Sequence, residues 1–468
     1  MASSDTELDD LRTPLGDASI DGRALSECAD ANPASEKGVR EMLCDFEELD
    51  IVEASHLPDG IVRNISSYLT NESSSLLTLL AMCGTCRQWR NAVQELELDN
   101  CLSFDGFDNV FSQQPMVQRF RKLSATSKEE VFVAAAKLFS GYSEAALSGD
   151  GATDRVLVNL ARRVGSSLKK FKIHNSSNVT DAGLHALLSR SCNLQHVHLE
   201  ELSKAVSGEF LVDLFERCRN IQSVSLSAMP SVSWAQCKAS AHTWPELSIT
   251  KLHVRGVNLD SEFGILLNRM PRLAELEIDG HARNITAAAL SCCCLTRVSY
   301  QVASRSHLDE ALAALVTLPQ LKTLELIVKN FTLCSDQLRV VGMLPLVELR
   351  LDSYIYKQQP TLSRSSYSHV DNEGVKALVD SICNRWCAMA SEMQPLKLSM
   401  CGATALTHDA VSALLRLPIL TELDIGGCCR IIAMDKMRLV AKVRAGREML
   451  ESGRRPSMRN SRFPGLFL

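Results

Sequence analysis

The sequence predicts an α/β fold in which short strands alternate with helices and stack into one long array. Three observations support this prediction. An apolar triplet with the spacing apolar-x-x-apolar-x-apolar occurs ten times between residues 168 and 425. Helix-forming stretches with an apolar face follow the triplets. The chain has 468 residues and 46% hydrophobic residues, which is enough to build such an array and a smaller domain beside it.

The triplets mark the predicted strands. Eight of the nine spacings between consecutive triplets lie between 22 and 28 residues, and the remaining spacing is 47 residues. We assign the long spacing to one repeat with an inserted surface loop, because it contains only one helix-forming stretch. The triplets are Leu168/Phe171/Ile173, Leu194/Val197/Leu199, Ile221/Val224/Leu226, Ile249/Leu252/Val254, Leu273/Leu276/Ile278, Leu295/Val298/Tyr300, Leu321/Leu324/Leu326, Leu346/Leu349/Leu351, Met393/Leu396/Leu398 and Leu420/Leu423/Ile425.

The helical stretches complete the repeating unit. Residues 179–188, 370–379 and 406–415 align without gaps, and in each the polar residues at the second and third positions precede an apolar i, i+3, i+4 face. A single strand and helix cannot bury their apolar faces alone. Neighbouring units must therefore stack into a solenoid with a continuous core.

The repeats resemble the cysteine-containing class of leucine-rich repeats. The resemblance rests on the triplets, on the helix start V-T-D-A-G-L at Val179 to Leu184, and on Cys401 and Cys428, which stand three residues after a triplet. It implies a horseshoe of about ten repeats over residues 155–430, with a parallel sheet on the concave face and helices on the convex face.

Residues 57–93 predict a small helical hairpin ahead of the array. Leu57 and Pro58 precede apolar residues at helical spacing, and a second helix ends at Cys-Arg-x-Trp-Arg, residues 86–90. A unit of about forty residues cannot bury such a face alone. It requires a partner, which is either the following domain or another chain.

This hairpin resembles an F-box, so we expect an F-box-like domain over residues 51–100. In that family the helices dock on a Skp-type adaptor, which links them to a cullin-RING ubiquitin ligase. By the resemblance, the adaptor-binding residues are Leu57, Pro58, Ile61, Ile65, Leu69 and Trp89. The alternative is a helical cap that shields the first repeat, as solenoids require.

The flanking segments differ in charge. Residues 1–50 hold fourteen acidic and four basic residues, whereas residues 430–468 hold ten basic and three acidic residues. We expect a disordered acidic segment at 1–50, a helical linker at 101–154 and a disordered basic tail at 431–468. The tail lacks interleaved aromatic residues, so nucleic acid is not an expected partner.

Catalytic, metal-binding and membrane-spanning classes find no support in the sequence. No phosphate loop, dinucleotide fingerprint, zinc-protease motif or hydrolase elbow occurs, so we expect a chain that is not an enzyme and holds no metal or cofactor. Cys83 and Cys86 form a C-x-x-C pair without the surrounding βαβ pattern of a redox site. The chain also has no secretory signal and no apolar run long enough for a bilayer, which favours the cytoplasm or nucleus.

The concave face is the expected substrate-binding surface. Strand side chains alternate, so the residues on either side of the central apolar position of each triplet point away from the core. The early repeats place basic or neutral residues there, and the later repeats place mixed and acidic ones. An acidic or phosphorylated protein segment would suit the basic end, whereas the alternative is an ordinary solvated face. The candidate residues are Lys170, Lys172, His196, His198, Lys251 and His253.

These features together predict a substrate-recruiting subunit of a Skp-cullin-F-box ubiquitin ligase. Its partners would be the adaptor, through it a cullin, and an unknown protein substrate bound by the repeats. The alternative is a leucine-rich-repeat scaffold that binds no adaptor. A third possibility is a thiol enzyme that uses Cys83 and Cys86.

Overall fold

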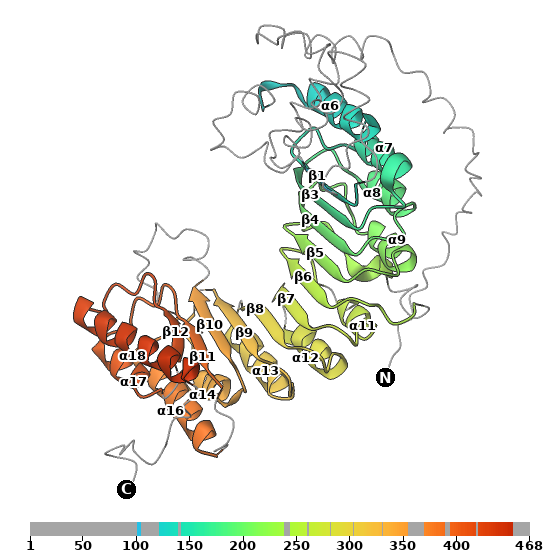
Figure 1. The fold of residues 1–468 in the computed structure, drawn as a ribbon. Helices are drawn as coiled ribbons and strands as arrows, with labels where there is room; N and C mark the ends of the chain where they lie inside the picture. The colour runs from blue at the N-terminus through green and yellow to red at the C-terminus, as the bar shows by residue number, and fades with distance from the viewer. Residues whose placement is uncertain are drawn as a thin grey trace, which may run out of the picture. The chain divides into compact units, whose positions relative to one another are not determined.

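The computed structural model contains one long parallel sheet flanked by helices (Figure 1). It describes residues 101–103, 121–138, 142–237, 244–259, 262–280, 282–302, 304–329, 331–353, 369–388, 394–417 and 420–452. The acidic segment 1–50 and the F-box-like segment 51–100 lie outside the described residues.

In the described residues, twelve strands form the sheet in sequence order, and each strand pairs in parallel with the next. The strands are β1 Cys101–Ser103, β2 Glu144–Ser148, β3 Lys170–Ser176, β4 His196–Leu202, β5 Ser223–Ser227, β6 Lys251–Arg255, β7 Glu275–Gly280, β8 Arg297–Val302, β9 Thr323–Val328, β10 Glu348–Ser353, β11 Leu396–Ser399 and β12 Leu420–Asp424.

Helices connect the strands and cover one face of the sheet (Figure 1). This alternation of strand and helix along one continuous parallel sheet is a leucine-rich-repeat solenoid, as the sequence predicts. The helical elements are α6 Ala125–Leu138, α7 Asp154–Val164, α8 Asp181–Leu188, α9 Phe210–Arg217, the 3-10 helix η4 Trp234–Cys237, α11 Phe263–Leu267, α12 Ala282–Ser291, α13 Arg305–Leu315, α14 Ser335–Met343, α16 Asn372–Ala388, α17 His408–Leu414 and α18 Ala433–Glu451.

The core lies between the sheet and these helices. In β3, Phe171 and Ile173 are 2% and 0% exposed, whereas Lys170 before them is exposed and Lys172 between them is half-buried. In β9, Leu324 and Leu326 are fully buried in the same way. Burial of one face therefore fixes the strand register, because a slip by one residue would expose every apolar side chain.

Hydrogen bonds at the helix starts join neighbouring repeats. The hydroxyl of Thr180 caps α8 by accepting from the backbone N–H of Ala182 at 3.2 Å. Asp154 of the preceding repeat accepts from the Thr180 N–H at 2.8 Å and from its hydroxyl at 2.7 Å. Gly183 permits this contact, since a β-carbon there would overlap the Asp154 carboxylate. Asp181 continues the series by accepting from the N–H and hydroxyl of Ser207 at 2.6 and 2.8 Å.

The sheet begins before the predicted boundary at residue 155. The segment 101–154 is not only a helical linker, because β1 and β2 belong to the sheet and flank α6. In β2, Ala145 and Leu147 pair with Phe171 and Ile173 of β3. Both are buried, but the small alanine hides the apolar triplet in the sequence.

Strand β11 has a different register from the predicted one. The triplet Met393/Leu396/Leu398 would pair Leu396 with Leu349, whereas Leu398 occupies that position. Met400 is fully buried and follows Leu398 at the spacing of the repeat. The pair of outward residues in this repeat is therefore Lys397 and Ser399.

The basic C-terminal segment contains a helix where we predicted disorder. Helix α18 packs beside β12, where Gly446 lies so close that a β-carbon would overlap the Leu420 carbonyl oxygen. The Arg447 guanidinium donates to the Thr421 carbonyl at 2.7 Å. Because an uncovered edge strand would expose unpaired backbone groups, α18 acts as a cap at this end of the sheet. Residues 453–468 lie outside the described residues.

None of the described helices combines the length and apolar character that a membrane span requires.

Candidate functional site on the open face of the sheet

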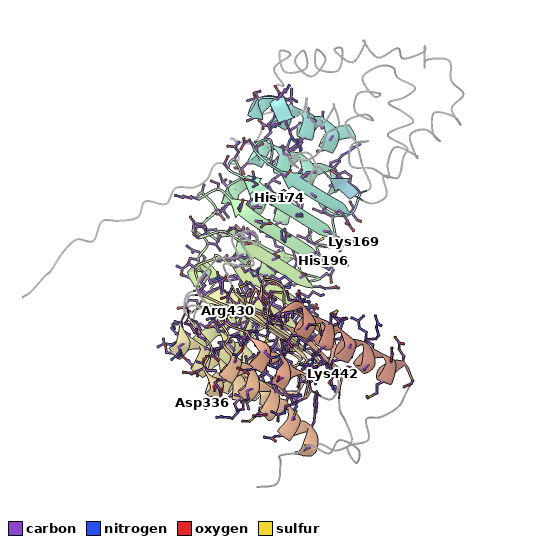
Figure 2. All side chains as sticks on the ribbon, turned by 90° about the vertical axis from the view of Figure 1, so that its left-hand side faces the viewer. Lys169, His174, His196, Asp336, Arg430 and Lys442 are labelled. Carbon is purple, nitrogen blue, oxygen red and sulfur yellow. The ribbon has the colours of Figure 1, made fainter. Side chains whose placement is uncertain are left out.

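The sheet face opposite the helices, which we call the open face, carries the polar strand residues (Figure 2). Strand alternation places them there, since their neighbours in sequence are buried in the core. The register aligns them into rows across the strands. One row runs Glu144, Lys170, His196, Ser223, Lys251, Glu275 and Arg297, and the next runs Ala146, Lys172, His198, Ser225, His253, Glu277 and Ser299.

The first groove on this face, the N-terminal groove, spans β2 to β6. It has a volume of about 400 Å³. The structure brings five of the six predicted substrate-binding residues together on its lining: Lys170, Lys172, His196, His198 and His253. Two serine hydroxyls, those of Ser223 and Ser225, lie among them. Lys251 is the exception, because it lies in the same row but outside the lining.

Carboxylates on neighbouring strands engage several of these cations. Lys170 pairs with Glu144 at 2.5 Å, and Lys251 pairs with Glu275 at 2.7 Å. Arg255 forms an ion pair with Glu277. Sequence reasoning missed Glu144, because it lies in the segment assigned to the linker, and Arg255, because it follows the triplet.

Two histidines of the groove have lowered pKa values. Burial lowers the pKa of His196, and the nearby Lys170 charge lowers that pKa further. Burial also lowers the pKa of His253, although the Glu277 carboxylate at 3.8 Å acts in the opposite direction. His198 lies 3.2 Å from Glu200 of its own strand. His196 and His253 therefore favour the neutral form and gain charge as the pH falls.

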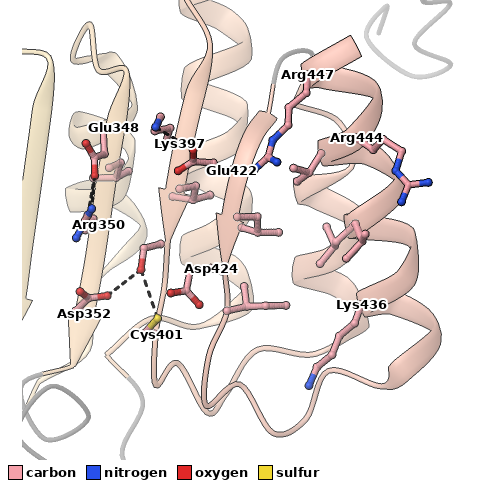
Figure 3. Close-up of a pocket in the computed structure, with 18 residues that line it drawn as sticks. Glu348, Arg350, Asp352, Lys397, Cys401, Glu422, Asp424, Lys436, Arg444 and Arg447 are labelled. Atoms are coloured by element: carbon pink, nitrogen blue, oxygen red, sulfur yellow. Dashed lines mark hydrogen bonds and ion pairs between the residues drawn. The ribbon is translucent and has the colours of Figure 1, made fainter. Parts of the chain in front are cut away.

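The second groove, the C-terminal groove, lies between the open face of β10 to β12 and α18 (Figure 3). Its volume is about 1020 Å³. Charged residues line both walls, with Glu422 and Asp424 on the sheet and Arg444 on the helix (Figure 3). Sequence reasoning missed this groove, because it assigned the residues of α18 to a disordered tail.

The sheet wall of the C-terminal groove is internally paired. Arg350 pairs with Glu348 at 2.6 Å, and Lys397 pairs with Glu422 at 2.9 Å. Ser399 donates to Asp352 at 3.1 Å. Cys401 at the rim is no reactive thiol, since burial raises its pKa to about 11.

The open face has the chemistry of a binding surface. Cations, carboxylates and hydroxyls recognise peptides and phosphate groups without any bond being made. The described residues hold no group of three or more His, Cys, Asp or Glu side chains arranged to bind a metal ion. The six predicted adaptor-binding residues, Leu57, Pro58, Ile61, Ile65, Leu69 and Trp89, lie outside the described residues, as do Cys83 and Cys86.

The chain was compared with protein families and with solved structures. No protein-family model matches the chain. A solved structure, the crystal structure of the Rad7 and Elc1 complex in yeast, contains a chain that is similar at 14% sequence identity with a TM-score of 0.46. The match covers 86% of this chain and 90% of that chain.

Proposed function

We propose that this protein is a substrate-recruiting subunit of a Skp-cullin-F-box ubiquitin ligase. The F-box-like segment at residues 57–93 would bind a Skp-type adaptor, and the open face of the solenoid would bind a protein target. The adaptor in turn would connect the chain to a cullin in the cytoplasm or nucleus.

The observation that carries this proposal is the open face itself. In the described residues, rows of polar side chains cross neighbouring strands on a face that the repeat helices leave uncovered. Repeat proteins use such extended surfaces to bind other proteins. An adaptor-binding motif ahead of a protein-binding surface is the arrangement that a substrate receptor needs.

Under this proposal the chain contributes proximity and no catalytic group. A rigid solenoid would hold the target so that its lysines meet the ubiquitin-charged enzyme at high effective concentration. The thiols of Cys218 and Cys428 fit this non-catalytic role, because burial raises the pKa of both and keeps them protonated.

The adaptor interaction can be tested with purified full-length protein and a Skp-type adaptor. We expect a stable complex that the double substitution Pro58→Ala/Ile61→Asp abolishes, because the second change places a charge in the expected apolar contact. The matched control is Leu290→Asp, which puts the same charge on an apolar residue that is 82% exposed far along the chain. Folded protein that binds no adaptor would instead support the scaffold alternative.

The target interaction can be tested at the N-terminal groove. We expect the triple substitution Lys170→Glu/Lys172→Glu/Lys251→Glu to weaken binding of an acidic or phosphorylated peptide by more than about tenfold, because it replaces attraction by repulsion. Adaptor binding should stay unchanged. Retained peptide binding by the triple variant would identify these lysines as an ordinary solvated face.

A further inference from the structure

Helix α18 carries an unusual concentration of exposed apolar side chains. Met434, Met437 and Val440 on the helix are 62%, 60% and 61% exposed, and Ile432 just before it is 62% exposed. The opposite side of the helix is buried at Asp435, Leu439 and Gly446. The exposed residues recur at helical spacing, so they form a stripe that covers neither the sheet nor another described helix. Contiguous exposed apolar surface of this kind marks interaction sites.

The stripe continues into the C-terminal groove. Val440 belongs to both, and Leu439 and Val443 of α18 line the groove beside Leu423 of β12 and Ile425 just after that strand. Leu423 and Ile425 are only half-buried, unlike their counterparts Leu349 and Leu351 in β10, which are 1% and 0% exposed. The last strand and the cap helix thus share an apolar floor that opens to solvent.

The helix side of this floor is basic and lacks carboxylate partners. Among the described residues, Lys436 and Arg444 form no ion pair, and Arg447 uses its guanidinium to bind a backbone carbonyl. On the sheet side Glu422 pairs with Lys397, whereas Asp424 accepts from the Gly426 N–H at 3.0 Å and keeps its negative charge. The groove lining holds five basic and four acidic residues, so a small excess of positive charge, concentrated on the helix side, lies beside exposed apolar surface.

We propose that α18 and the C-terminal groove form a docking site for an amphipathic segment of a partner protein in which apolar residues alternate with Asp and Glu. The apolar side chains of that segment pack on Val440, Met437 and the groove floor. Its carboxylates lie against Lys436, Arg444 and Arg447. Methionine side chains are flexible and polarizable, which suits a surface that adapts to a helical ligand.

Charge argues against the chain's own C-terminal tail as the occupant. Residues 453–468 contain four arginines and no acidic residue, so the cations of α18 would repel them. The site is also distinct from the N-terminal groove, where Lys170 of β3 pairs with Glu144 of the neighbouring strand. The proposal does not depend on the ligase role, and adaptor binding is measured separately.

Fluorescence anisotropy with full-length protein tests the proposal. The probe is a labelled helical peptide of about 14 residues in which leucines at helical spacing alternate with glutamates. A second probe has the same leucines with lysines in place of the glutamates. We expect the acidic peptide to bind at least about tenfold more tightly than the basic one, and its affinity to fall as salt rises from about 50 to about 500 mM.

Two variants assign the binding to this site. Met437→Glu/Val440→Glu and Arg444→Glu should each weaken binding of the acidic peptide by at least about tenfold. The first places negative charge in the apolar stripe, and the second reverses the charge on the helix side of the groove. The matched controls are Leu290→Glu, at a leucine that is 82% exposed on α12, and Arg162→Glu, at an exposed arginine on α7. These should bind as the unmodified chain does. Thermal melting of each variant verifies that it is folded.

Three results would overturn the proposal. Equal binding of the acidic and basic peptides would remove the charge argument. Loss of binding in the control variants would place the interaction elsewhere. A concentration-dependent dimer that Met437→Glu/Val440→Glu dissociates, seen by light scattering in the absence of peptide, would identify a second copy of this chain as the occupant.

Discussion

The two grooves of the open face differ in the origin of their charge. In the N-terminal groove every lining residue comes from strands of the repeat, and Lys170 is balanced by Glu144 on the neighbouring strand. In the C-terminal groove the strands are balanced in the same way, as Lys397 and Glu422 illustrate. The unbalanced cations Lys436 and Arg444 come from α18, which is not a repeat helix.

Cross-strand pairing neutralises much of the charge that the repeat places on its open face. Parallel strands in register bring side chains of consecutive repeats side by side, so opposite charges at equivalent positions pair. A larger groove arises where a helix outside the repeat pattern borders the sheet, and this helix adds cations that form no ion pair with the strands. Perturbing each end in turn tests this distinction.

Acid should destabilise the C-terminal half through a buried histidine. His369 is 1% exposed, and its ring Nε2 lies 2.6 Å from the Leu351 carbonyl oxygen. Burial lowers the pKa of His369 to about 4. The neutral ring is therefore favoured in the folded state, so its contribution is complete above the unfolded pKa of about 6.5 and is lost as the pH falls toward 4.

The expected loss from His369 is about 3 kcal/mol between pH 6.5 and pH 4, measured by urea unfolding at several pH values. His369→Gln should reduce this acid dependence, because the amide can still donate to Leu351 but cannot titrate in this range. An unchanged pH profile in His369→Gln would contradict the assignment.

Moving α18 away from β12 should remove the helix wall of the C-terminal groove, so that this groove, like the N-terminal groove, is formed by strands alone. Gly446→Ala places a methyl group against the Leu420 carbonyl. We expect a loss of about 2 kcal/mol in the free energy of unfolding, because the helix must shift away from β12. We also expect weaker binding of the acidic helical peptide. The neighbouring exposed residue provides the control Ala445→Ser, which should change stability by less than about 0.5 kcal/mol.

Protonation of His196 and His253 should increase the positive charge of the N-terminal groove. A bound carboxylate stabilises the imidazolium form of His196 and His253, whose pKa values are lowered in the free protein. Affinity for an Asp-rich peptide should therefore rise by about tenfold as the pH falls from about 7.5 to about 5.5. Isothermal titration calorimetry measures this change. His196→Gln should reduce the rise, and a rise of the same size in that variant would assign it to other groups.

The smallest expected effect concerns the exposed pair Lys397 and Glu422. Both side chains are about half exposed, at 46% and 50%, so solvent screens their attraction. Lys397→Ala should change the free energy of unfolding by less than about 0.5 kcal/mol. A loss of more than about 1 kcal/mol in chemical unfolding would show that these open-face pairs are structural, which would weaken the distinction between the two grooves.

Much of the fold follows from the sequence because a single physical rule repeats. Leu324 and Leu326 are buried for the same reason as their counterparts in each repeat, so periodicity alone locates most strands. Alternation then places Lys170 and His196 on the open face. The helix start V-T-D-A-G-L is explained by contacts, since Asp154 binds Thr180 and Gly183 makes room for it.

The remainder depends on interactions that spacing does not reveal. Ala145 is too small to mark β2 as a strand of the array. Around β11, Leu396, Leu398 and Met400 alternate in the same way, so two registers fit the pattern and pairing with Leu349 selects one. Helix α18 has few large apolar residues on its buried side. It is ordered by contact with β12 through Gly446 and Arg447, which local composition does not encode.

The proposed role of this chain is to link an adaptor to a protein-binding face without supplying catalysis. A reconstituted reaction with ubiquitin, its activating and conjugating enzymes, a cullin-RING complex and a Skp-type adaptor tests this role most directly. We expect ubiquitin transfer to lysines of this chain, through proximity alone, and loss of transfer in Pro58→Ala/Ile61→Asp. Equal transfer to both proteins, or none to folded unmodified protein that has bound the adaptor, would contradict it.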